Sequence, residues 1–306
     1  EQSHTAGTSV LDQVGDNIIH HVSNSSLDQP LIHLPQIFGI NFSVTKHVLM
    51  LWIVTILLTC AVIIPVRKYL QQDKPVPSGW MNVLESIVKF FRDSVIHPNI
   101  GSKYSETWAP LILTFFFFIL FANEIGLIPV FDFLGALKRF VFQVPASAEH
   151  NLIKSLLHGG VTATGNFNLI AGLAVITFFA IMIAGIYAHG FINHWKNLAP
   201  HGLPWPVYII LIPIEIIGMF VKPFALTMRL AANMTGGHIA ILAILSFMAI
   251  FAEMFQSTVT GLSLALFSIP MATAISGLEL IVVMVQAYVF TLLSAVFIGM
   301  AINVHH

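Results

Sequence analysis

Charged residues are scarce in this chain, and so are cysteines and the motifs that bind nucleotides or metals. Only 9% of the 306 residues are charged, against about 25% in a typical soluble domain. Cys60 is the only cysteine, which excludes a disulfide framework. The sequence has no GxxxxGKS or GxxxxGKT loop, no CxxC pair and no HExxH motif, so we expect no nucleotide site, metal site or cofactor. A net charge of −1 argues against a nucleic-acid partner.

Hydrophobic residues make up 57% of the chain and gather in long uncharged runs. About 20 apolar residues suffice to cross a bilayer as a helix, so the runs predict an all-α integral membrane protein of about five to six helices. The polar stretch 1–44 is expected to be an extramembrane tail before a membrane domain over 45–306. In that domain we expect a first span over about 47–66, an interfacial amphipathic helix over about 78–96, spans over about 107–130 and 168–193, and two long helices over about 206–250 and 260–303.

Basic residues predict how the membrane domain is oriented, because lysine and arginine are enriched in cytoplasmic loops. Outside the two long helices, the expected topology places seven basic residues inside and four outside. The inside set is Arg67, Lys68, Lys74, Lys89, Arg92, Lys103 and Lys196, and the outside set is Lys46, Lys138, Arg139 and Lys154. This bias favours an external amino terminus. The chain begins at Glu1, which suggests that this terminus is processed or trimmed.

The two long helices exceed what an upright span requires. At about 1.5 Å per residue each would reach roughly 60 Å, twice the thickness of the hydrocarbon core. Tilt is the simplest way to relieve such a mismatch. We therefore expect both helices to lie far from the membrane normal.

Arg229 is the most informative residue, because it lies in an apolar stretch with no acid nearby in the sequence. Its guanidinium stays charged in any setting and requires a counter-charge at membrane depth. Glu215, Lys222 and Arg229 are seven residues apart, which places them on one stripe of the helix. With no carboxylate close by in the sequence, we expect the partner of Arg229 to be a carboxylate on another protein.

Other polar residues accompany Arg229 in the long helices. Asn233 follows it by one turn, and Gln286 follows Glu279 by seven residues. His238 and Glu279 could meet across the helical hairpin, and such a pair can exchange protons near physiological pH. Buried Asn and Gln side chains also serve as hydrogen-bonded contacts between helices, which stays an alternative for Asn233 and Gln286. Two adjacent glycines, Gly236 and Gly237, precede His238. They could take a direct part in the site or only permit close packing of a neighbouring helix.

A family resemblance rests on these residues. The stretch KPFALTMRLAANMTGGH over 222–238, with Glu215, Glu279 and Gln286, and the stretch NEIGLIP over 123–129 closely resemble the a subunit of F-type ATP synthases. The resemblance implies that Arg229 faces the rotor with Asn233 and Gln286 as polar neighbours. It also makes Glu215 a candidate for the exit half-channel and Lys222 a possible supporting residue. Many bacterial members carry Glu and His where this chain has His238 and Glu279, an exchange also found in mitochondrial members.

The resemblance implies a proton-translocating stator subunit that forms two half-channels and performs no catalysis itself. Its partners would be the c-ring, b-type peripheral stalk subunits, other ATP synthase subunits and the lipid bilayer. A bacterial inner membrane is the expected location, with a mitochondrial inner membrane or thylakoid as alternatives. A self-contained transporter or channel stays open as a rival, although the internal repeat that it predicts is not found. A membrane scaffold is a third possibility.

Overall fold

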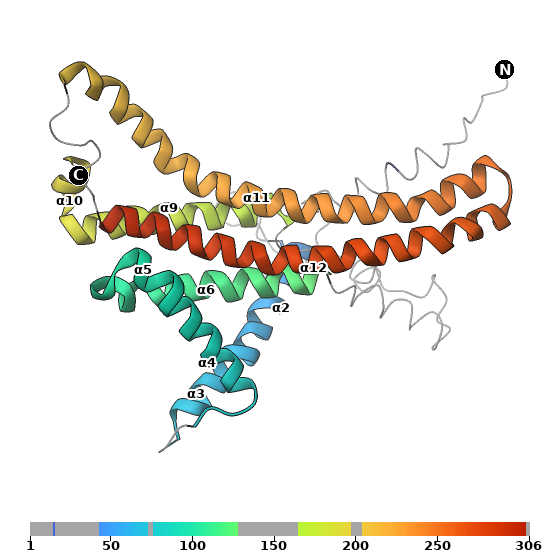
Figure 1. Ribbon diagram of the computed structural model, residues 1–306, viewed down its shortest axis with the longest axis horizontal. Coiled ribbons are helices and arrows are strands. Elements are labelled where there is room, and N and C mark those ends of the chain that lie inside the picture. The colour runs from blue at the N-terminus through green and yellow to red at the C-terminus, as the bar shows by residue number, and fades with distance from the viewer. Residues whose placement is uncertain (1–14, 16–42, 73–75, 128–164, 197–203, 304–306) are drawn as a thin grey trace. The chain divides into compact units, whose positions relative to one another are not determined.

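The computed structural model describes residue 15 and residues 43–72, 76–127, 165–196 and 204–303 (Figure 1). Every element of regular structure within these ranges is a helix. Five of the described helices are long and apolar enough to cross a membrane, and they cover His47–Leu70, Ser102–Leu127, Phe167–His189, Trp205–Met254 and Thr258–Ile302. The all-α membrane class predicted from composition is thereby confirmed. The expected tail over 1–44 lies almost wholly outside the described residues, and so does the stretch between the expected spans over about 107–130 and 168–193.

The helices follow one another with few breaks. The order is α2 (Lys46–Leu58), the π-helix η1 (Thr59–Ile63), α3 (Ile64–Leu70), α4 (Trp80–Phe91), the π-helix η2 (Arg92–Ile96), α5 (His97–Ile100), α6 (Ser102–Leu127), α9 (Phe167–His189), α10 (Phe191–Lys196), α11 (Trp205–Met254) and α12 (Thr258–Ile302). α6 begins five residues before the expected start of its apolar span. Its first turns carry the exposed Lys103 and Glu106, so they extend the helix with a polar segment.

The residues form two compact units. One unit contains 1–51, 122–166 and 232–283, and we call it the hairpin unit because the end of α11 and the start of α12 lie side by side in it (Figure 1). The other contains 52–121, 167–231 and 284–306, and we call it the bundle unit. Each of the two long helices is divided between the units: one part of α11 and one part of α12 belong to the hairpin unit, and the other parts belong to the bundle unit.

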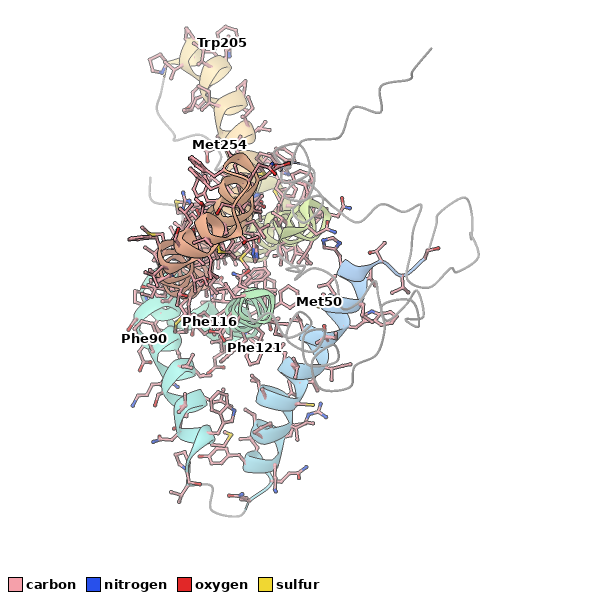
Figure 2. The ribbon with its side chains drawn as sticks, turned by 90° about the vertical axis from the view of Figure 1, so that its right-hand side faces the viewer. Met50, Phe90, Phe116, Phe121, Trp205 and Met254 are labelled. Carbon is pink, nitrogen blue, oxygen red and sulfur yellow. The ribbon has the colours of Figure 1, made fainter. Side chains whose placement is uncertain are left out.

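Aromatic side chains anchor α4 within the bundle unit. The ring centroid of Phe91 lies 4.3 Å from that of Phe116 on α6 and 6.0 Å from that of Tyr288 on α12. Phe90 adds a further contact at 6.1 Å from Tyr288, and Figure 2 marks Phe90 and Phe116. At the other end of α4, the indole of Trp80 donates a hydrogen bond of 2.7 Å to the backbone oxygen of Ala61 in η1. The amphipathic segment predicted over 78–96 is therefore a helix with one packed face.

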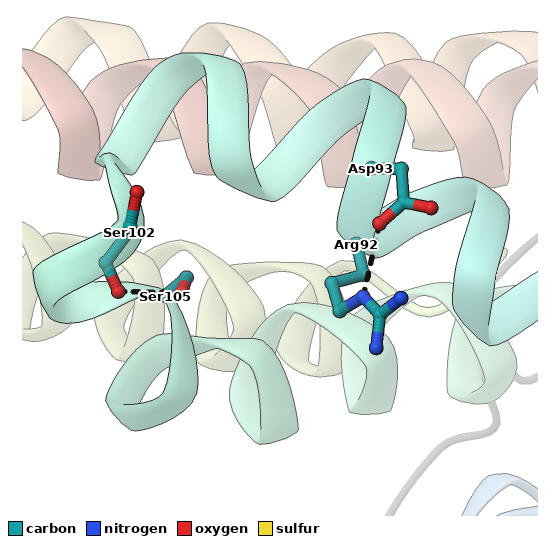
Figure 3. Close-up of polar contacts among 4 residues, drawn as sticks. All are labelled: Arg92, Asp93, Ser102 and Ser105. Carbon is teal, nitrogen blue, oxygen red and sulfur yellow. Dashed lines mark hydrogen bonds and ion pairs between the residues drawn. The ribbon is translucent and has the colours of Figure 1, made fainter.

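Two polar contacts follow α4 in the chain, an exposed one in η2 and a part-buried one in the first turn of α6. Arg92 Nε donates to Asp93 Oδ1 at 3.0 Å, and the Ser105 hydroxyl donates to the Ser102 backbone oxygen at 3.0 Å (Figure 3). The hydrogen bond from Arg92 lowers the pKa of the Asp93 carboxyl below its usual value. Both side chains of the ion pair are about half exposed, and pairs of this kind contribute little to stability.

The short helix α10 folds back onto the end of α9. Gly190, with φ of +81°, separates the two helices, a conformation that glycine adopts without strain. The imidazole of His194 then lies on Gly185, where any larger residue would overlap the ring. His194 is 6% exposed, and its Nε2 atom has no hydrogen-bond partner among the described residues.

Acid should loosen this packing. Burial, and to a smaller degree the nearby His189, lowers the pKa of His194. The unfolded chain therefore binds a proton more readily, so the stability contributed by neutral His194 is lost progressively as the pH falls below about 6.5 towards the lower pKa of the folded state. We expect a lower thermal unfolding temperature in detergent at pH 5.5 than at pH 8, and a smaller difference for His194→Phe. An equal difference in the variant would contradict this assignment.

Candidate functional site

Arg229 lies at the midpoint of α11, as the 25th of its 50 residues. Its neighbours Leu226 and Leu230 are 4% and 2% exposed and pack in an apolar cluster with Phe290 of α12. Arg229 itself is exposed, on the side of α11 that the bundle unit leaves uncovered. The packing of two leucines thus presents a cation outward from the middle of an apolar helix.

No ion pair or hydrogen bond reaches Arg229 from the described part of the chain. Two turns earlier on the same stripe, Lys222 Nζ lies 3.3 Å from Glu215 Oε1. That lysine and that glutamate neutralise each other, so the positive charge of Arg229 is left uncompensated. A charge that a helix carries at membrane depth without a partner is costly and marks a functional site.

Glu279 occupies the corresponding place in α12, as the 22nd of its 45 residues. It is 4% exposed, and neither carboxylate oxygen has a hydrogen-bond partner within the described residues. The carboxylate lies against Gly237 of α11, where a methyl group would come within 2.5 Å of Glu279 Cδ and 3.0 Å of Oε2. The hairpin unit therefore holds a buried acid that only a glycine at position 237 can accommodate in this conformation.

The remaining predicted site residues differ in their surroundings. His238 directly follows Gly237 and is partly buried, so the backbone places it near Glu279 although no hydrogen bond joins the two side chains. Asn233 is exposed one turn beyond Arg229, and Gln286 is partly buried on α12. Gly236 is exposed with open space around its α-carbon, so its role differs from that of Gly237.

Sequence reasoning missed one participant, Gly218. The Lys222 side chain lies over it on the way to Glu215, with Cε and Nζ 3.7 and 3.9 Å from where a methyl group would stand. The only sign of this contact in the sequence is the seven-residue spacing of Glu215 and Lys222. Spacing alone shows a shared stripe, however, and does not show that the two side chains meet.

A multi-pass α-helical membrane protein with a lone cation and a buried acid at the midpoints of its two longest helices has the features of an ion-translocating subunit. Residues 48–299 match the family "ATP synthase A chain". The chain is 40% identical to ATP synthase subunit a 2 of Chlorobium luteolum, over 95% of this chain and 76% of that protein. It is 38% identical to ATP synthase subunit a 2 of Prosthecochloris aestuarii, over 95% and 80%, and 37% identical to ATP synthase subunit a of Myxococcus xanthus, over 87% and 75%.

The chain therefore belongs to the ATP synthase A chain family. It is a membrane-sector stator subunit of an F-type ATP synthase that translocates protons, acts with other subunits of that enzyme and is not catalytic by itself. These findings confirm the family and the function predicted from the arginine motif.

Proposed function

We propose that this subunit forms two half-channels against a c-ring and that Arg229 separates them. The observation that carries this proposal is the exposed and uncompensated guanidinium at the midpoint of α11. A rotor carboxylate passing Arg229 would supply the missing counter-charge. Elsewhere around the ring that carboxylate must be protonated, because a bare charge facing lipid costs several kcal/mol.

Glu279 and His238 form the inlet side in this proposal. Glu279 is buried without a hydrogen-bond partner in the described chain, so it is available to take up and release a proton. Hydroxyl side chains on α12, the buried Ser268 and the partly buried Ser276, lie between the α11–α12 turn and Glu279. We infer that protons reach Glu279 from the end of the hairpin unit that carries this turn. Asn233 and Gln286 then serve as polar neighbours where the proton passes to the rotor.

Glu215 lies on the other side of Arg229, ten residues into α11, and forms the exit in this proposal. The basic residues that follow the first span support a cytoplasmic position for that end of α11. The amino-terminal tail over 1–44 is then external and α4 lies in the cytoplasmic interface of the membrane domain over 45–306. The bacterial relatives favour a bacterial plasma membrane.

The lengths of α11 and α12 support a strong tilt in the membrane. With 50 and 45 residues, they extend over roughly 75 and 68 Å at 1.5 Å per residue, more than twice the hydrocarbon core of about 30 Å. Tilted helices would contact several rotor helices at once and separate the two half-channels laterally.

Extraction of the native complex in mild detergent tests the assembly. A tagged copy of this chain should co-purify with a ring-forming c subunit and with b-type stalk subunits, identified by mass spectrometry. An unrelated tagged multi-pass protein of the same membrane is the control. Recovery of this chain alone, from vesicles that nevertheless pump protons when ATP is added, would contradict the proposed partners.

A further inference from the structure

The ion pair between Lys222 and Glu215 has an unusual reach, because the two residues are two full turns apart on α11. Lys222 Nζ lies 3.3 Å from Glu215 Oε1, and the two side chains are 37% and 41% exposed. Pairs on helix surfaces ordinarily join residues three or four apart. A contact over seven residues requires both side chains to extend toward each other along the helix.

The Lys222 side chain passes beside Gly218 on its way to Glu215. Side chains in a helix lean toward its amino-terminal end, so Lys222 runs naturally back over Gly218, four residues before it. The glycine has no side chain in the way, and the ammonium lies beside it. The Glu215 carboxylate must turn toward the carboxy-terminal end to meet the ammonium, which is the direction that leads to Arg229.

From this geometry we propose that Lys222 is a positioning residue that holds the Glu215 carboxylate toward Arg229. The inference rests on the role of Glu215 as the exit group in the proposed function. Lys222 keeps the acceptor oxygen extended along the stripe on which a rotor proton is released. It also neutralises that carboxylate, so that Glu215 does not become the counter-charge of Arg229 in place of the rotor.

Without the ammonium, the Glu215 side chain returns to the amino-terminal lean that helices favour. The carboxylate then lies further from Arg229, and the step between rotor and exit becomes slower. Arginine at position 222 retains the charge and can reach the same oxygen, so it should preserve the arrangement. Methionine has a similar length and no charge, so it should retain the apolar packing and lose the effect on Glu215.

The test measures ATP-driven proton uptake into inverted membrane vesicles that contain the assembled enzyme, normalised to the amount of this subunit in the membrane. We expect Lys222→Met to reduce uptake about fivefold, the effect of removing a partly exposed pair, and Lys222→Arg to retain at least about half of the original rate. Lys196→Met is the matched control, because Lys196 is an exposed lysine of α10 outside the membrane spans. Uptake by Lys222→Met within twofold of the unchanged enzyme would overturn the proposal.

A charge exchange separates positioning from structural support. In the double variant Glu215→Lys with Lys222→Glu the pair can still form, but position 215 carries a cation, so no carboxylate stands at the proposed exit position. We expect normal amounts of the subunit in the membrane and uptake as low as in Lys222→Met. Restored uptake would show that the pair is only structural and would overturn the inference. Arg229→Ala tests the proposed function separately from the inference about Lys222, because pumping by that variant would refute the proposed function itself.

Discussion

Replacing Arg229 by alanine should abolish coupled proton transport while the subunit remains in the membrane. The side chain is exposed and forms no hydrogen bond or ion pair with the described residues, so its removal leaves no buried cavity and breaks no ion pair there. A rotor carboxylate would meet an apolar surface instead of a cation. Leaving one charge of a sheltered pair alone costs roughly 3–5 kcal/mol, which corresponds to a decrease in flux of at least about a hundredfold.

The measurement is ATP-driven acidification of inverted vesicles, with the ATPase rate and the amount of subunit recorded in parallel. Arg229→Gln should behave as the alanine variant does, and Arg229→Lys should recover only part of the activity. A lysine ammonium lacks the planar fork of the guanidinium and loses its proton when it is desolvated. Coupled pumping by Arg229→Ala at the normal rate would sink the proposed mechanism.

A control within α11 separates this effect from general damage to the helix. Leu226→Ala removes a buried side chain of the same cluster and should destabilise the subunit by about 2–5 kcal/mol. Its consequence should therefore be a smaller amount of subunit in the membrane, with the flux per subunit largely retained. For Arg229→Ala we expect a normal amount of subunit in the membrane and a strongly reduced flux per subunit.

The charged groups of the membrane domain are easy to find in the sequence because charges are rare in it. Arg229 and Glu279 are conspicuous in stretches of apolar residues, and the structure places each at the midpoint of a single unbroken helix. The helical class and the apolar spans follow from the same scarcity of charge. A long uncharged run in a membrane leaves the backbone few options other than a helix.

Side-chain contacts were harder to predict. Glu215 and Lys222 share a stripe by their spacing, but their contact depends on the direction in which the lysine extends. The two adjacent glycines behave differently because each residue advances by about 100° around the helix. One of them therefore faces Glu279 and the other faces open space. Such differences arise from packing between helices. The spacing of residues along one helix does not show which neighbouring residue each of them contacts.

The pairing of His238 with Glu279 illustrates the same limit. A meeting across the hairpin was expected from the residue types, and the structure places the Glu279 carboxylate against the residue that precedes His238. The backbone of α11 next to His238 thus lies close to Glu279, but the Glu279 carboxylate accepts no hydrogen bond from the His238 imidazole. A proton relay between them stays a prediction.

Gly237→Ala should strongly reduce proton flux without impairing assembly. The new methyl group would overlap the carboxylate end of Glu279 and no backbone atom, so the flexible glutamate has to move and the helices do not. A displaced carboxylate no longer lies where the proposed inlet delivers protons. Misplacement of a reacting group by about 1 Å can cost roughly a hundredfold in rate, and we expect a decrease of at least about tenfold in vesicle acidification.

The matched control for this prediction is the adjacent glycine. Gly236→Ala adds the same methyl group to the same helix, but nothing in the described chain lies within 4 Å of it. Flux per subunit should therefore fall clearly less than in Gly237→Ala, and any decrease would come from the stripe that faces the rotor in the proposed function, which Gly236 shares because it lies seven residues beyond Arg229. Combining Gly237→Ala with Glu279→Asp should recover part of the lost flux, because the shorter acid leaves room for the methyl group. Equal losses in the two glycine variants, with no recovery in the combination, would show that Gly237 does not act through Glu279.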